Sequence, residues 1–258
     1  LSHEATPALA QLGFSSLFFY AMAALPYRRH GPAWAAAIGL IGLTLSGAPT
    51  LALLFGLGSA VLHFADRESV GSDTTRKSHI VQEAIAIALL SLGTTVLALS
   101  LGLLRWKVEW PEATWSEWNG FVQLLVWFTW PAWPLALWTL WRWRRQLFNR
   151  RISRHIALPA WFALMCTGAT LVSPSSDRTL LLALPALSTL AAFALPTLKR
   201  QVAALIDWFT LLFFSGCAFI IWVVWIAMQT GVPAQPAANV ARLAPGFEAQ
   251  FSFLALCI

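Results

Sequence analysis

The chain has 258 residues and a formal net charge of +6, and it is 58% hydrophobic but only 11% charged. A soluble domain would carry about 25% charged residues, whereas the mean hydropathy here is +0.67. This composition excludes an ordinary soluble globular protein and predicts an all-α integral membrane protein. The positive charge does not indicate nucleic-acid binding. The basic residues gather in short joints between apolar runs, which is typical of membrane topology.

The alternation of apolar runs and charged joints predicts a polytopic bundle of about eight transmembrane helices, since a crossing takes about 20 apolar residues. In chain order, the expected spans are 7–26, 33–46, 49–64, 80–104, 121–141, 156–172, 179–198 and 203–230. We expect these spans to form a single domain, 1–230. An outer tail, 231–258, follows. Its residues 231–250 are Pro- and Ala-rich and are expected to be loosely ordered, and residues 251–258 are expected to start a further span.

An uncharged run from Gly31 to Ala65 is too long for one crossing at about 1.5 Å per residue. It is interrupted by Gly47-Ala48-Pro49, and proline and its predecessor both disfavour continued helix. The interruption predicts a hairpin of two short spans, and a single kinked helix is the alternative.

Tryptophan is abundant, with 15 residues. The segment 105–120 contains four of them and is expected to lie flat on a membrane surface, because the indole ring favours the headgroup level. Four more in the span 121–141 would share one helical face unless Pro131 and Pro134 kink it apart. They are Trp127, Trp130, Trp138 and Trp141. Such a face would stack on a sugar or carotenoid ring, or pack against helices and lipid.

The basic residues orient the spans. Thirteen of the 17 lie in joints that alternation assigns to the cytoplasmic side: 28–32, 66–79, 142–154 and 199–200. The N-terminus, the Trp-rich segment, the loop 173–178 and the tail then lie outside. This arrangement is the positive-inside pattern. The localisation that we expect is integral in a bacterial inner membrane.

Charges within spans are functional hypotheses by default. Glu83 and Asp207 are the clear ones, but each lies within about one turn of the inner end of its span. Both are therefore interpreted as reaching back to the interface, and His63 as a structural, hydrogen-bonded residue.

No motif for a metal or cofactor is present. The cysteines, Cys166, Cys217 and Cys257, lie in apolar runs without a CxxC pair, which argues against a disulfide framework and a zinc site. There is no HExxH, Walker A or dinucleotide motif. No cofactor is predicted, although the sequence leaves a divalent metal ion open.

One loop and the span after it carry a recognisable pattern. Ser175-Ser176-Asp177-Arg178 is followed by Leu184-Pro185-Ala186-Leu187, and this pair resembles a motif of the polytopic GT-C glycosyltransferases. The relevant branch contains the lipid A aminoarabinose transferases and the protein mannosyltransferases. Gly39 to Leu57 resembles the family segment GLxxLTKGPxxLLL, and His3-Glu4 with Leu9-Ala10 resembles the stretch before it. The resemblance covers roughly residues 1 to 200.

The chain departs from the family pattern in three places. Leu182 stands where the branch often has tyrosine, and Ser46-Gly47-Ala48-Pro49 replaces its Lys-Gly-Pro element. The family's catalytic acidic residue in the first outer loop has no clear counterpart. The resemblance therefore implies that the first spans are missing and that the sequence is part of a longer protein.

The resemblance implies transfer of a sugar from a polyprenyl-phosphate donor to an acceptor at the outer face. Arg178 would bind the donor phosphate, with Arg105 and Lys107 as further cations, and Glu4 would be a weak candidate for the catalytic acid or base. Ordinary interfacial roles compete with each assignment: an ion pair with Asp177, headgroup anchoring, or a frayed end.

Two other functions remain open. A non-catalytic membrane subunit would scaffold or anchor other membrane subunits, and the missing acidic loop favours it. A transporter would need polar residues along a central pathway, and these are scarce. The expected partners are membrane lipid and a polyprenyl-linked sugar, with no nucleic acid.

Overall fold

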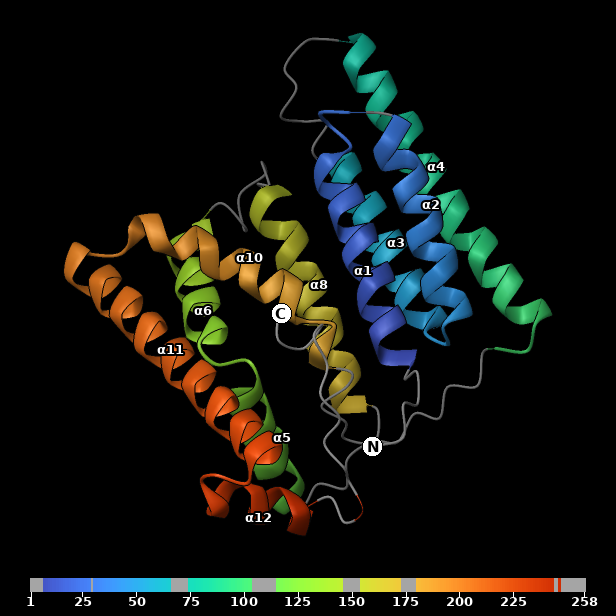
Figure 1. The fold of residues 1–258 in the computed structure, drawn as a ribbon. Coiled ribbons are helices and arrows are strands. Elements are labelled where there is room, and N and C mark those ends of the chain that lie inside the picture. The colour runs from blue at the N-terminus through green and yellow to red at the C-terminus, as the bar shows by residue number, and fades with distance from the viewer. Residues whose placement is uncertain are drawn as a thin grey trace. The chain divides into compact units, whose positions relative to one another are not determined.

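A computed structural model of the chain describes residues 7–28, 30–65, 74–103, 115–145, 154–172, 180–243 and 246. Over these ranges the regular elements are helices and no strand occurs, which confirms the all-α class. The helices, shown in Figure 1, are α1 (Pro7–Ala24), α2 (His30–Leu45), α3 (Pro49–Ala65), α4 (Thr74–Ser100), α5 (Trp115–Phe128), α6 (Ala132–Arg142), α8 (Arg154–Val172), α10 (Leu184–Ala194) with the 3₁₀ turn η2 (Leu195–Thr197), α11 (Arg200–Thr230) and α12 (Ala234–Leu243).

Only some of these helices have both the length and the hydropathy of a full membrane span. In the described part of the chain, α1, α4 and α11 have the length and hydropathy of a full span, and α5 with α6 would add a fourth if they are one broken span. The helices α2, α3 and α10 with η2 are apolar but shorter. By length and composition the structure thus gives three or four candidate spans, fewer than the eight predicted.

The chain divides into two compact units. The bundle unit comprises residues 5–197, and the C-terminal unit comprises residues 198–258 together with 1–4. The boundary therefore differs from the expected division into 1–230 and 231–258, because α11 clusters with α12.

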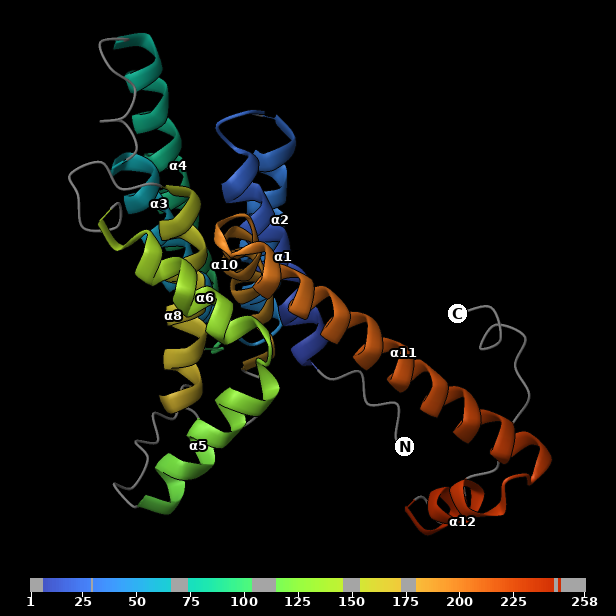
Figure 2. The ribbon, with the colours of Figure 1, turned by 90° about the vertical axis from the view of Figure 1, so that its left-hand side faces the viewer.

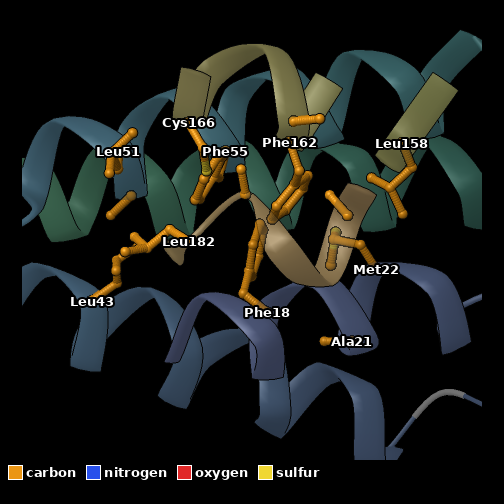
Figure 3. Close-up of a cluster of buried hydrophobic side chains, with 14 of the residues drawn as sticks. Phe18, Ala21, Met22, Leu43, Leu51, Phe55, Leu158, Phe162, Cys166 and Leu182 are labelled. Atoms are coloured by element: carbon orange, nitrogen blue, oxygen red, sulfur yellow. The ribbon is translucent and has the colours of Figure 1, made fainter. Parts of the chain in front are cut away.

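Two antiparallel helix pairs build the first half of the bundle unit. The helix α1 packs against α2, and α3 packs against α4, while α8 lies against α3. Three aromatic rings meet where these helices converge (Figure 3). The ring of Phe162 stacks on Phe55 at a centroid distance of 4.2 Å and lies 6.0 Å from Phe18. All three rings are buried, so they tie α1, α3 and α8 into one core.

Glycine allows α1 and α2 to approach closely. A Cβ placed on Gly39 of α2 would lie 2.9 Å from Phe18 Cβ and 3.0 Å from the Phe14 carbonyl oxygen. Small residues permit such contact between apolar helices. The close packing of α1 against α2 therefore requires a residue without a side chain at position 39.

The expected hairpin between α2 and α3 is present, and the single kinked helix is wrong. Gly47 has φ +93°, the left-handed conformation that glycine adopts without steric cost. The amide of Ala48 donates to the Leu43 carbonyl, and that of Gly47 donates to the Thr44 carbonyl. These two bonds form the Schellman motif that ends helices, and Pro49 then begins α3.

The expected kink near Pro131 is a complete break. The axes of α5 and α6 differ by 91° across it. Trp127 therefore lies on α5, whereas Trp138 and Trp141 lie on α6. The condition for one shared tryptophan face is therefore not met, because the break redirects the chain between the four residues.

The expected span 179–198 does not form one continuous α-helix. Its regular part is α10, which has 11 residues, followed by η2. Figures 1 and 2 show that α10 lies across α8 instead of along it. Thr139 of α6 donates a hydrogen bond of 2.7 Å to the Leu190 carbonyl of α10, which joins the two helices.

The C-terminal unit consists of α11 and α12 in its described part. The 31-residue α11 ends at Gly231, whose φ is +75° and whose amide donates to the Ala227 carbonyl. The chain then forms α12 over residues that were predicted to be a loosely ordered tail. That prediction is wrong for 234–243, where Ala-rich sequence favours helix.

Candidate functional site

The four residues that the family resemblance singles out lie outside the described part of the chain. They are Glu4, Arg105, Lys107 and Arg178. The nearest described residues on the chain are Pro7 for Glu4, Leu103 for Arg105 and Leu180 for Arg178, and Val172 ends α8 before the segment 173–179. The expected surface segment 105–120 is described only from residue 115, where it already belongs to α5.

Two hydrogen bonds define the direction of the helices that flank these residues. Gln11 Nε2 donates to the Ser46 carbonyl at 2.8 Å, which places the start of α1 beside the turn between α2 and α3. Arg154 Nη2 lies 3.3 Å from the Ala23 carbonyl oxygen, so α8 begins beside the end of α1. We call the first end of the bundle unit the Pro7 end and the second the Arg154 end.

The helices α4 and α8 therefore both finish at the Pro7 end. The pairing of His63, late in α3, with Glu83, early in α4, makes these helices antiparallel. Figures 1 and 2 agree that α1 starts where α4 and α8 finish. The described residues next to the three predicted segments thus share one end of the unit.

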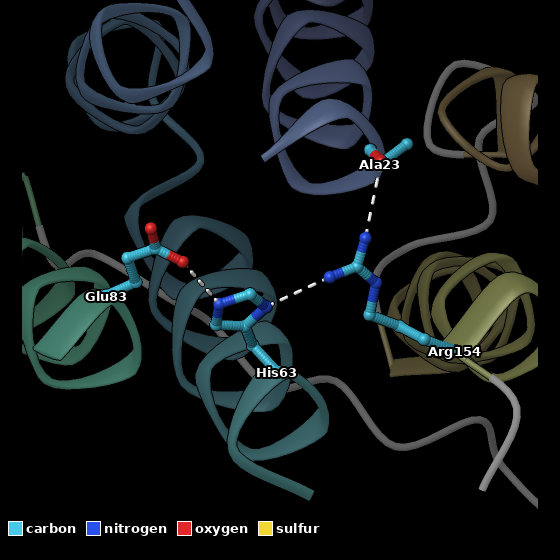
Figure 4. A network of polar contacts seen from close by, with 4 residues as sticks. All are labelled: Ala23, His63, Glu83 and Arg154. Atoms are coloured by element: carbon cyan, nitrogen blue, oxygen red, sulfur yellow. Dashed lines mark hydrogen bonds and ion pairs between the residues drawn. The ribbon is translucent and has the colours of Figure 1, made fainter. Parts of the chain in front are cut away.

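A charged cluster occupies the Arg154 end (Figure 4). His63 Nε2 lies 2.9 Å from Glu83 Oε2, and Arg154 Nη1 lies 3.0 Å from His63 Nδ1. With Ala23, these residues connect α1, α3, α4 and α8. His63 and Arg154 are 4% and 7% exposed. Charges are seldom buried unless they are paired and hydrogen-bonded, and this cluster meets that condition.

The contacts assign the protons on His63. A guanidinium only donates hydrogen bonds, so Nδ1 of His63 must accept from Arg154. The carboxylate of Glu83 accepts, so Nε2 carries the hydrogen that it donates. The imidazole is therefore neutral in this arrangement, and it stands between the guanidinium and the carboxylate.

Sequence reasoning did not find this cluster. Glu83 was interpreted as reaching the interface and Arg154 as one of many cations in an inner joint. The available signal was that residues 63 and 83 lie at the same end of consecutive antiparallel helices, where their side chains can pair. His63 is hydrogen-bonded, as the sequence predicted.

A shallow hollow lies at the start of α5, between Trp115, Trp118, Asn119 and Val122. Trp115 is 91% exposed. The described residues that line this open patch all belong to α5, and none of these four is charged.

No described group of three His, Cys, Asp or Glu side chains is placed to hold a metal ion. Cys166 is buried and Cys217 is half-buried, and both are free thiols. Asp207 lies exposed in the second turn of α11.

Comparison of the chain with protein-family models, with curated proteins and with solved structures gave no match.

Proposed function

We propose that the chain spans a bacterial inner membrane with eight helices, including the shorter ones, and is glycosyltransferase-like. It would transfer a sugar from a polyprenyl-phosphate donor to an acceptor at the outer face. The family resemblance of 175–178 and 39–57 suggests this chemistry. The helix lengths are compatible with it, because α1, α4 and α11 can each cross a bilayer.

The observation that carries the proposal is the shared end of α1, α4 and α8. Arg105 and Lys107 follow the end of α4, and Arg178 belongs to the segment 173–179 between the end of α8 and Leu180. A transferase of this kind needs cations at the phosphate leaving group and a carboxylate at the acceptor. Two helices that finish at one end of the bundle unit, α4 and α8, are suited to bringing the cations together there.

Arg178 is assigned to the donor phosphate, because a guanidinium binds phosphate through two parallel hydrogen bonds. Arg105 and Lys107 would add positive charge as the phosphate leaves. Glu4 would orient or deprotonate the acceptor hydroxyl. In this orientation the Pro7 end faces outward and the Arg154 end faces the cytoplasm, which agrees with the positive-inside distribution.

The test is sugar transfer by the purified protein in liposomes that contain a polyprenyl-phosphate sugar. We expect Arg178→Ala to lower the transfer rate at least about tenfold, since hydrogen bonds to charged groups contribute about 1.5–3 kcal/mol. Arg144→Ala is the matched control. Arg144 is exposed, and its guanidinium lies over the ring of Trp141 at the C-terminal end of α6. Equal rates for Arg178→Ala and the unsubstituted protein would reject the assignment.

The surface of α11 favours a second function, that of a membrane subunit that anchors a partner. Along its length α11 exposes large apolar side chains, among them Trp208, Phe214 and Phe219. If liposomes show no transfer with any donor, this function takes precedence. Polar substitutions on α11, such as Phe214→Ser, would then release a co-purifying membrane subunit, whereas Leu164→Ser on α8 would not.

A further inference from the structure

Three arginines lie within four residues at the end of α6. They are Arg142, Arg144 and Arg145, and all three are exposed. Arg142 is the last residue of α6, Trp143 forms a turn, and Arg144 and Arg145 are again helical. No hydrogen bond or ion pair connects the side chain of Arg142 or Arg145 with another residue in the described part of the chain. Both guanidinium groups are therefore available to a ligand.

Arg144 differs from its two neighbours, because it is bound to Trp141. Its Nη1 atom donates a hydrogen bond of 2.9 Å to the Trp141 carbonyl, and its Cζ atom lies 4.5 Å from the centroid of the Trp141 ring. The first contact satisfies a carbonyl at the end of the helix, and the second is a cation–π contact. Arg144 thus carries the same charge as its neighbours, but its guanidinium is held on α6.

The turns of α6 before Arg142 expose large apolar side chains. Leu137 is 55%, Trp138 is 44% and Trp141 is 66% exposed. Trp138 lies three residues before Trp141 and four before Arg142, a spacing that places the three residues on one face of the helix. The ring of Trp138 is fixed by a hydrogen bond of 3.1 Å from its Nε1 to Thr197 Oγ1. The basic end of α6 therefore continues an aromatic surface.

The order of these side chains matches the chemistry of a phospholipid. Lipid chains are apolar, tryptophan rings favour the headgroup level, and the phosphate is an anion that accepts hydrogen bonds. Along α6 the exposed side chains change in the same sequence, from leucine through tryptophan to arginine. Since a helix rises about 1.5 Å per residue, the change from Leu137 to Arg145 takes about 12 Å.

We propose that Arg142 and Arg145 bind the phosphate of an anionic membrane lipid, such as phosphatidylglycerol, whose glycerol region lies against Trp138 and Trp141. A guanidinium binds phosphate through two parallel hydrogen bonds. The positive-inside pattern predicts a cytoplasmic side for the joint 142–154, which contains six arginines. Anionic lipids give the surface of that leaflet a negative potential, so charge complementarity favours this ligand.

Headgroup charge decides the specificity. Phosphatidylglycerol carries a net negative charge, whereas phosphatidylcholine carries a quaternary ammonium next to its phosphate. The arginines repel this ammonium, so phosphatidylcholine would bind more weakly. Inorganic phosphate has the anion but lacks the chains that bury apolar area, so it would also bind more weakly than the anionic lipid.

This inference rests on the membrane embedding in the proposed function but not on sugar transfer. The experiment is native mass spectrometry of the detergent-purified protein, in which bound lipid is measured against lipid concentration. The probes are phosphatidylglycerol and phosphatidylcholine with identical chains, and inorganic phosphate is added as a competitor. We expect phosphatidylglycerol to bind at least about fivefold more tightly than phosphatidylcholine, and an equal concentration of inorganic phosphate should not displace it.

Single substitutions in the arginine segment are decisive, because each removes the same charge. Arg142→Ala and Arg145→Ala should each weaken phosphatidylglycerol binding about tenfold, since hydrogen bonds between charged groups are lost. Arg144→Ala is the matched control and should change the affinity by about twofold at most, because a charge without direct contact to the lipid is screened by salt. All three side chains are exposed, so the variants should keep their thermal unfolding midpoints.

Three outcomes would overturn the proposal. They are equal affinities for the two lipids, displacement of phosphatidylglycerol by an equal concentration of inorganic phosphate, or equal affinities of the three alanine variants, which would indicate diffuse attraction by charge. Arg178→Ala separates this proposal from the transferase assignment, because it should keep phosphatidylglycerol binding whether or not it lowers transfer. Failure of the transferase assignment would therefore leave the lipid result intact.

Discussion

Arg154 and His63 are 91 residues apart in the chain, yet Nη1 of the arginine lies 3.0 Å from Nδ1 of the histidine. The contact joins the first turn of α8 to the last turns of α3. Through Nε2 the same imidazole reaches Glu83 of α4 at 2.9 Å, and through Nη2 the same guanidinium reaches the Ala23 carbonyl of α1 at 3.3 Å. The contacts of two side chains thus connect four helices at the Arg154 end of the bundle unit.

Replacement of this arginine should loosen the bundle unit. Arg154→Met keeps much of the side-chain volume but removes the donors to His63 and to the Ala23 carbonyl. A buried group that loses its hydrogen-bond partner costs about 1–3 kcal/mol, which we expect as a lower free energy of unfolding and a lower thermal midpoint. Arg144→Met is the control, because Arg144 is exposed and exposed substitutions change stability by less than about 0.5 kcal/mol. Equal midpoints for the two variants would contradict this account of the cluster.

The sequence predicted the helices well where the signal is local. The break at Gly47-Ala48-Pro49 is an example, since glycine and proline determine the end of one helix and the start of the next from their own backbone preferences. Hydropathy likewise predicted the start of α1 at Pro7 and the span 156–172, which lies within α8. Hydropathy and helix-breaking residues are properties of a short window, so one sequence is enough to find them.

The charged cluster could not be predicted from any short window of the sequence. Its formation depends on the register of α3 against α4 and on the placement of α8 beside both helices. The 91° change of direction between α5 and α6 is similar: Pro131 predicts a distortion, but its size depends on the packing of the flanking helices. The four predicted site residues fall outside the described ranges, and their roles stay predictions.

A pair of glycines on neighbouring helices tests the packing of α1 against α2. Gly39→Ala would place a Cβ 2.9 Å from Phe18 Cβ and 3.0 Å from a backbone oxygen. Neither atom can rotate away, so the helices must separate, at a cost of about 1–3 kcal/mol. Gly13→Ala meets nothing within 4 Å and should instead stabilise α1 by up to about 1 kcal/mol, from helix propensity.

Thermal unfolding of both glycine variants in one detergent measures the contrast. The two substitutions add the same methyl group to a helix of similar length, so differences in detergent binding largely cancel. We expect opposite shifts of the midpoint. A Gly39→Ala protein as stable as Gly13→Ala would show that α1 and α2 are not in contact at this point.

Removal of the central aromatic ring should be the most damaging single change in the core. Phe162 contacts Phe18, Phe19 and Phe55, so Phe162→Ala leaves a cavity between α1, α3 and α8. Substitutions of this kind cost about 3–5 kcal/mol. Leu164→Ala on the same helix is the control, since Leu164 is 60% exposed. The free energy of unfolding should hardly change in the control, and a similar loss in both variants would argue against the core in Figure 3.

The two ends of α4 test the proposed orientation in the membrane. Its 27 residues extend over about 40 Å, which exceeds the bilayer's hydrocarbon core of about 30 Å. Ser78 near its start and Leu101 just past its end are both exposed.

In a protein whose native cysteines are replaced by alanine, we expect a membrane-impermeant maleimide to label Leu101→Cys in intact cells. Ser78→Cys should react only after the membrane is opened, because the Arg154 end is proposed to face the cytoplasm. Labelling of both positions in intact cells would mean that α4 does not cross the membrane, and the reversed pattern would place the Pro7 end, and with it the proposed transfer chemistry, on the cytoplasmic side.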